Sequence, residues 1–285
     1  MKTKNAFRYL MVAATVGMLF TACRKTKDTP ADTDTSAASD NALAEGTYND
    51  VHNISDEAAS GSLTSYMGAY SSDEKEYLST CATITHDSTG TGGSTVRNFH
   101  INFGTTDCMC MDGRNRRGTI NISISAGHFY WDSTAVKTIT FTNYYVNDNQ
   151  VLGSKTVTNK GRNAAGNFVF DVSVNGTINK AGGGTITWTS TRTREWFQNG
   201  TPLTHSDDYY LITGSGSGTN ASGNSFTATI TTALRKDVGC HHFVSGQFQL
   251  TPSGKPTRYF DFGAGACDNQ ATVTINGNVY NITLG

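Results

Sequence analysis

Alternation of apolar and polar side chains with a period of two is the feature that most constrains the fold of this chain. Threonine, serine or asparagine fills most of the intervening positions. Because successive strand side chains point to opposite faces, each run predicts a strand with one buried and one solvated face, as in antiparallel sheets. The apolar members of six such runs are Ile120 to Ile124, Ile139 and Phe141, Phe168 to Val174, Ile186 and Trp188, Phe226 to Ile230, and Val273 and Ile275.

Turn dipeptides between the runs indicate how these strands connect. They are Asp112-Gly113, Asn175-Gly176, Asn199-Gly200 and Asn276-Gly277, which are typical of tight hairpins. We therefore predict an all-β fold of about twelve strands in an antiparallel meander. A sheet of this size must curl or fold on itself to cover its apolar face, so we expect a large curled sheet or an irregular sandwich. The outer Thr and Asn positions do not fit the lipid-facing surface of a membrane barrel. Helical periodicity is nearly absent, with one short candidate from Asn53 to Ala59.

The first 22 residues have the form of an export signal. Lys2, Lys4 and Arg8 precede an apolar run from Leu10 to Phe20, which is shorter than the ~20 residues needed to span a bilayer. The string LFTAC that ends at Cys23 resembles a lipobox, the cleavage site of lipoprotein signal peptidase. This resemblance implies cleavage before Cys23 and acylation of its sulfur, for example by palmitate chains, so the lipid bilayer is the expected partner. An ordinary secretory signal is the alternative.

The segment after Cys23 predicts a tether. Residues 23–46 are polar, with almost nothing to bury, and such a segment is expected to be flexible. We predict one β-rich domain over residues 47–285. Arg24 rather than an acid follows Cys23, which favours the outer membrane; the sequence leaves open whether the domain faces the periplasm or the cell surface. Loss of the three basic residues of the signal moves the formal charge from −1 to −4, which argues against nucleic acid as a partner.

The cysteines after Cys23 reveal an internal repeat. Cys81 and Cys108 are 27 positions apart, and so are Cys240 and Cys267. Within each interval a Phe-Gly pair falls at the same offset from the first cysteine, and an alternating strand follows the second. We interpret residues 81–127 and 240–284 as two related units, one opening the domain and one closing it.

In an oxidising compartment this spacing predicts two disulfides, Cys81–Cys108 and Cys240–Cys267. Cys110 is left over. It could replace Cys108, pair with another chain or stay a thiol. A metal or redox site formed by Cys81, Cys108 and Cys110 is the less favoured alternative, because the second unit has no comparable cluster.

Two blocks resemble a known group of proteins. The closing string RYFDFGAGACDNQATVTINGNVYNITLG and the INFG…CxC…DGR block of residues 101–118 are similar to hallmarks of Bacteroidota β-rich outer-membrane lipoproteins. The likeness covers most of residues 75–285. It implies a location and an architecture, and it carries no catalytic residues to this chain.

Motifs for chemistry are sparse. The chain has no P-loop, HExxH, nucleophile elbow or dinucleotide fingerprint. Adjacent strand residues point to opposite faces, so His241 and His242 beside Cys240 are not expected to share a metal. We therefore expect no metal, no cofactor and no catalytic residues. Two charged groups are interpreted as surface features: a solvated hairpin tip with Asp112, Arg114, Arg116 and Arg117, and an ion-pair row with Arg192, Arg194 and Glu195.

Aromatic side chains near strand ends are the best indication of a ligand. Flat rings there can stack on a sugar or anchor a protein, although packing is the more common role. The sequence favours a non-enzymatic binding module for an envelope glycan or protein. A structural or adhesive component and a hydrolase with an unrecognised site are the alternatives. The candidate ligand-facing aromatics are Trp131, Tyr144, Trp196 and Tyr209, with Tyr145 and Tyr210 beside them.

Overall fold

A computed structural model of the protein describes residues 32–62, 78, 80–129, 131–198, 207–240 and 242–283. Within these ranges the chain forms one long α-helix, one short 3₁₀ turn and a single fourteen-stranded antiparallel sheet. The helix is α1 (Ser36–Ser62). The strands are β1 (Thr83–Thr89), β2 (Val96–Asn102), β3 (Cys108–Met109), β4 (Asn115–Ile124), β5 (Val136–Val146), β6 (Asn149–Arg162), β7 (Phe168–Asn179), β8 (Thr185–Phe197), β9 (Tyr209–Thr219), β10 (Ser225–Asp237), β11 (Ser245–Pro252), β12 (Arg258–Ala264), β13 (Gln270–Ile275) and β14 (Asn278–Thr283).

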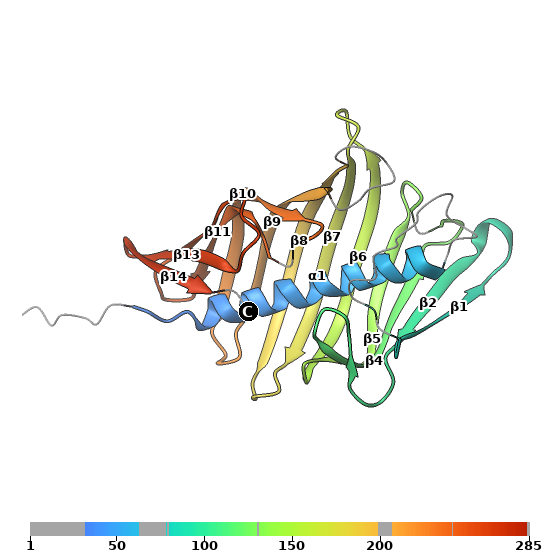
Figure 1. The fold of residues 1–285 in the computed structure, drawn as a ribbon, viewed down its shortest axis with the longest axis horizontal. Helices are drawn as coiled ribbons and strands as arrows, with labels where there is room; N and C mark the ends of the chain where they lie inside the picture. The colour runs from blue at the N-terminus through green and yellow to red at the C-terminus, as the bar shows by residue number, and fades with distance from the viewer. Residues whose placement is uncertain are drawn as a thin grey trace, which may run out of the picture. The chain divides into compact units, whose positions relative to one another are not determined.

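The strands pair in sequence order, which confirms the predicted antiparallel meander (Figure 1). Only β3 leaves this path, pairing with β4 alone, and the sheet does not close on itself. The alternation also holds in detail: in β8 every second residue from Ile186 to Trp196 is buried. No helix in the described ranges combines the length and apolarity needed to cross a bilayer.

Two predicted hairpin turns are confirmed and one is wrong. Gly113, between β3 and β4, and the Asn276-Gly277 pair, between β13 and β14, adopt the positive φ that such turns require. Gly176 instead lies inside β7. A glycine is required at this position because a Cβ there would sit 2.0 Å from the Tyr48 hydroxyl. The Asn199-Gly200 pair lies outside the described residues.

The expected short helix over 53–59 is a 27-residue helix, and this is the main correction to the sequence-based prediction. Its exposed residues, Ser39, Ala42 and Gly46, form a narrow stripe, whereas most of the others are buried. Periodicity failed to indicate α1 because its buried positions include Asp40, Glu45 and other polar residues beside alanines.

The predicted flexible tether over 23–46 is therefore wrong for residues 36–46. They belong to α1, and Ala37, Ala38 and Ala44 are buried in the core. The domain begins at least eleven residues before the predicted boundary at residue 47. The predicted signal peptide, Cys23 and the chain up to residue 31 lie outside the described residues.

The repeat predicted from the cysteines has a structural counterpart. The disulfides Cys81–Cys108 and Cys240–Cys267 both form, and Cys110 is a free, buried thiol. In each unit a glycine with φ +83° has the same local hydrogen bond to the side chain two residues before it. The Gly104 amide donates to Asn102 Oδ1, and the Gly263 amide donates to Asp261 Oδ1, both at 2.8 Å. The two units therefore share local backbone geometry as well as cysteine spacing.

The core lies between α1 and the inner face of the sheet. Tyr48 of α1 contacts this core, and the Tyr48 hydroxyl donates to the Leu152 carbonyl of β6 at 2.7 Å. The helix runs across the strands rather than along them (Figure 1). Because of this crossing, residues from many strands face one helix.

Candidate binding site at the helix–sheet interface

Acidic side chains along α1 and just before it pair with basic side chains of the sheet. Both members of two pairs, Glu45 with Arg192 and Asp50 with Arg116, are buried, so these charges form part of the interior. From one end of the helix to the other, the pairs are Asp34 with Lys255, Asp40 with Lys180 at 2.7 Å, Glu45 with Arg192 at 2.6 Å, Asp50 with Arg116 at 2.7 Å, and Asp56 with Lys137 at 3.7 Å.

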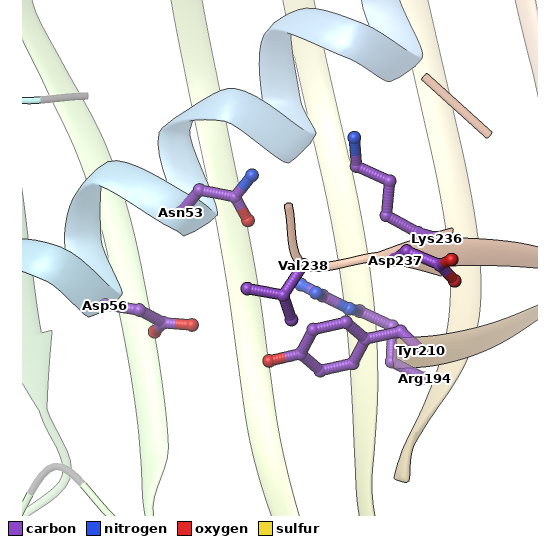
Figure 2. A pocket seen from close by; sticks show the side chains of 7 residues that line it. All are labelled: Asn53, Asp56, Arg194, Tyr210, Lys236, Asp237 and Val238. Atoms are coloured by element: carbon purple, nitrogen blue, oxygen red, sulfur yellow. The ribbon is translucent and has the colours of Figure 1, made fainter. Parts of the chain in front are cut away.

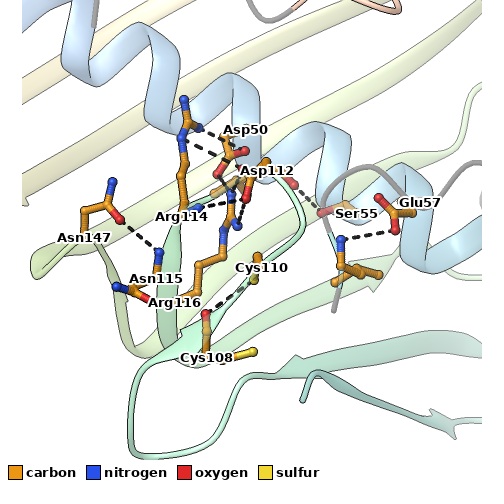
Figure 3. A network of polar contacts seen from close by, with 12 residues as sticks. Asp50, Ser55, Glu57, Cys108, Cys110, Asp112, Arg114, Asn115, Arg116 and Asn147 are labelled. Carbon is orange, nitrogen blue, oxygen red and sulfur yellow. Dashed lines mark hydrogen bonds and ion pairs between the residues drawn. The ribbon is translucent and has the colours of Figure 1, made fainter. Parts of the chain in front are cut away.

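The group around Arg116 is the most tightly bonded part of this interface (Figure 3). Arg116 Nη2 donates to Asp50 Oδ2 at 2.7 Å and to Asp112 Oδ2 at 2.6 Å, and Arg116 has no exposed surface. Arg114 adds an ion pair to Asp50 at 3.1 Å. The predicted solvated hairpin tip is therefore wrong for Asp112 and Arg116, whose side chains are buried against Asp50 of α1. Arg114 is half-exposed, and Arg117 pairs with Asp107 and Asp148 nearer to solvent.

Toward the C-terminal end of α1, three buried basic side chains of the sheet lie close together. Lys137, Lys155 and Arg194 are each at most 4% exposed. Lys155 Nζ donates to the Tyr48 carbonyl at 2.7 Å, a neutral partner. Among the described residues, the carboxylates that act on this group are Asp56 and Glu45, and Glu45 is already bonded to Arg192.

A cavity of about 140 Å³ opens beside this basic group. Two residues of α1, two from the inner face of β8 and β9, and three at the end of β10 line it (Figure 2). All of them except Arg194 are half-buried, so the cavity is accessible from solvent. The lining residues are Asn53, Asp56, Arg194, Tyr210, Lys236, Asp237 and Val238.

Arg194 is the most unusual residue of the lining. It lies against the Tyr210 ring, 4.1 Å from the ring centroid, and is 4% exposed. Its Nε and Nη1 atoms are buried and lack a hydrogen-bond partner within the described part of the chain. Buried polar groups are almost always hydrogen-bonded, so two unsatisfied donors on a cation that lines a cavity mark a place for an acceptor.

The other cavity charges are already engaged. Asp56 lies 3.2 Å from His52 Nε2 and 3.7 Å from Lys137 Nζ, and Asp237 accepts from Arg235 Nε at 2.6 Å. The Lys236 ammonium donates to the Cys240 carbonyl. Arg194 differs from these residues in having two buried donors that no described residue satisfies.

Burial shifts the titration of the groups around Arg194. Burial, and after it the charge of Arg194, lowers the pKa of Lys155 to about 7, against the opposing effect of Glu45 and Asp56. Burial likewise lowers the pKa of Lys137 to about 8, although Asp56 opposes the change. His52 has its pKa held well below the usual range, first by burial and then by Arg194, Lys155 and Lys137. The site therefore carries less positive charge near neutral pH than its composition indicates.

The candidate ligand-facing aromatics are scattered. Tyr144 is fully buried and stacks on Phe141, and Trp196 is 5% exposed with its Nε1 donating to Asp208 at 3.0 Å. Trp131 packs partly buried against the core. These rings pack inside the molecule rather than present a surface to a ligand.

The remaining tyrosines lie nearer to solvent. Tyr209 stacks on Phe197 with ring centroids 4.8 Å apart, and Tyr145 is half-buried beneath Arg117. Tyr210 alone among the predicted aromatics lines the cavity. The predicted ion-pair row on β8 is wrong, because Arg192 and Arg194 point inward and only Glu195 lies on the other face.

The residues that sequence reasoning missed are those of α1 and Arg194. Their signal was present in β8, where Arg192 and Arg194 share the parity of Trp188. The described residues contain no group of three or more His, Cys, Asp or Glu side chains placed to hold a metal ion. The neighbour of Cys240, His241, lies outside them. No protein-family model, curated protein or solved structure matches this chain.

Proposed function

We propose that this protein is a lipid-anchored envelope binding module that takes a small ligand into the cavity beside Arg194. The observation that carries the proposal is that Arg194, which lines a cavity of about 140 Å³, has two buried donors without a hydrogen-bond partner among the described residues. The export leader and the lipobox-like string before Cys23 support anchoring, as does the resemblance to Bacteroidota outer-membrane lipoproteins. The anchor keeps the cavity at an envelope surface.

Binding is favoured over hydrolysis by the state of the two cavity carboxylates. A general base must be free to accept a proton from its substrate or from water. Asp56 contacts His52 and Lys137, and Asp237 accepts from Arg235. Neither carboxylate is placed as an available base, whereas the donors of Arg194 are available for a ligand.

A structural or adhesive role is the second candidate, and the sheet edges favour it. Strand β1 pairs only with β2, and β14 pairs only with β13, among the described strands. Exposed edges can accept a strand from another chain. Val279 on β14 is 64% exposed, which adds an apolar side chain to that edge.

The anchoring half of the proposal is tested by metabolic labelling with a fatty acid and by membrane fractionation. We expect label on the protein and its recovery with membranes, and loss of both in Cys23→Ser. A wild-type protein that is unlabelled and recovered in the soluble envelope fraction overturns the anchor.

The binding half is tested by native mass spectrometry of the full acylated protein extracted from bacterial envelopes in mild detergent. Val238→Trp fills the cavity, and Val279→Trp is the matched control on the exposed β14 strand. We expect a bound small molecule on the wild type and on Val279→Trp, and its loss in Val238→Trp. If no molecule is bound, or if Val238→Trp binds it equally, the cavity is not the ligand site.

A further inference from the structure

The charge around the cavity indicates what kind of ligand the site prefers. The charged residues that line it are Asp56 of α1, Arg194 of β8, and Lys236 and Asp237 of β10. The buried charged or titratable groups that interact with Asp56 or Arg194, or with one another, are His52 and Glu45 of α1, Lys137 of β5, Lys155 of β6 and Arg192 of β8. Glu45 and Asp237 are bonded to arginines. Lys155 and Arg194 are both buried, and among the described residues no carboxylate is hydrogen-bonded to either of them. A buried cation is strongly unfavourable unless it is paired, so a negative charge beside these two residues is favoured.

We propose that the cavity binds an oxyanionic group, a carboxylate or a phosphate, with Arg194 as its main contact. This inference rests on the proposed function and names the ligand class of the same site. The guanidinium presents planar donors that suit carboxylate and phosphate oxygens. Tyr210, which lies against Arg194, and Asn53 of α1 add neutral polar atoms to the lining (Figure 2).

The size of the cavity agrees with this ligand class. One water takes about 30 Å³ of liquid volume, so the cavity has room for a group of several heavy atoms. A carboxylate or phosphate enters with its oxygens toward Arg194 while the rest of the ligand extends toward the half-buried opening. The lining residues other than Arg194 are all half-buried, so they are the ones available to contact whatever the oxyanion is attached to.

An anion in the cavity also couples binding to proton uptake. Its negative charge favours the protonated forms of Lys155 and Lys137, whose pKa values in the empty protein are lowered to about 7 and about 8. Binding above pH 7 therefore takes up protons, and the affinity falls as the pH rises from 7 to 9. A ligand that is neutral produces no such uptake.

The test is isothermal titration calorimetry of the full acylated protein in detergent micelles, with acetate, succinate and inorganic phosphate as probes. We expect at least one probe to bind the wild type, about tenfold more weakly at pH 9 than at pH 7, with proton uptake seen as a buffer-dependent enthalpy. Tighter binding of acetate or succinate than of phosphate indicates a carboxylate site, and the reverse order of affinity indicates a phosphate site.

Arg194→Met is the decisive variant, and Arg162→Met on an exposed strand position is its matched control. We expect Arg194→Met to bind the probe at least tenfold more weakly and the control to bind as the wild type does. Because Arg194 makes no hydrogen bond through Nε or Nη1, the empty variant should unfold no more easily than the wild type. Equal probe binding by wild type and Arg194→Met overturns the inference, and so does a variant that weakens binding only by unfolding.

The two proposals fail in different ways. If a neutral molecule occupies the cavity and is lost in Val238→Trp, while none of the three anions binds, the ligand class is wrong and the binding function stands. If neither a co-purified molecule nor an anion binds, both proposals are overturned. Lys155→Met adds a further check, because it should reduce proton uptake while Arg194 still holds the anion.

Discussion

Tyr48 of α1 lies flat against Trp188 of β8, with ring centroids 5.7 Å apart and ring planes 10° from parallel. Trp188 Nε1 donates to Asn41 Oδ1 at 3.0 Å, and Asn41 lies about two helical turns before Tyr48. These contacts fix the rotation of α1 against the sheet. That rotation in turn determines which helix residues face the charged interior and which, like Asn53, face the cavity.

Gly176→Ala should destabilise the protein because its Cβ would collide with the Tyr48 ring and force it away from Trp188. Overpacking of a core typically costs about 1–3 kcal/mol. Gly182→Ala is the matched control, since a Cβ there meets nothing within 4 Å. Urea unfolding of both variants measures the difference. Equal stabilities would show that α1 does not rest on β7 in this way.

Asp50→Asn should lower stability far more than Asp107→Asn. Asp50 holds the buried Arg116, whereas Asp107 pairs with Arg117 at the surface. Removing one partner of a buried ion pair costs about 3–5 kcal/mol, and an exposed pair contributes about 0–1 kcal/mol. Denaturant unfolding of the two variants at the same salt concentration provides the comparison. A similar loss in both would mean that water reaches the Arg116 group.

Stability should rise with pH between 7 and 9. The pKa of Lys155 is lowered to about 7 in the folded protein, whereas an unfolded lysine titrates near about 10.4, so the unfolded chain binds more protons in this interval. The expected gain from this residue is roughly 2–3 kcal/mol. Lys155→Met should flatten the profile, and the exposed Lys160→Met should not. A wild-type profile that falls over this interval would contradict the assignment.

Peptide mapping without reduction should find the links Cys81–Cys108 and Cys240–Cys267. Cys110 is 4% exposed, so a maleimide should label it only after unfolding. Replacing Cys240 and Cys267 together by serine should cost about 3–4 kcal/mol in the loop-entropy model. Rapid native labelling of Cys110, or a Cys110-linked dimer on a non-reducing gel, would instead support the adhesive role.

Much of the fold could be predicted from the sequence because burial in the sheet follows a local pattern of alternating residues. A period of two reports burial residue by residue, and it holds through β8 even where the inward side chain is an arginine. The cysteine spacing predicted the two disulfides for a similar reason, because the same separation of 27 positions occurs in both units. Both features depend on short stretches of chain and can be recognised without knowing the partner elements.

The helix and the cavity depend on distant partners, and local patterns could not predict them. Glu45 is buried because Arg192, 147 positions away, neutralises it, so neither residue resembles a core residue when taken alone. The inward parity of Arg194 was detectable, but its opposite wall comes from α1 and from the end of β10. When the two partners of a buried ion pair come from segments far apart in the sequence, neither segment can be recognised as part of the core from its own residues.

The crossing of α1 over the strands has a consequence for the order of folding. Arg258 Nη2 donates to the Asp34 carbonyl across a separation of 224 positions, so the first described segment is bonded to one of the last strands. Contacts of such long range slow the search for the native state. The helix can complete its contacts only after nearly the whole sheet has formed. Until then its acidic side chains and the lysines that pair with them remain exposed to water.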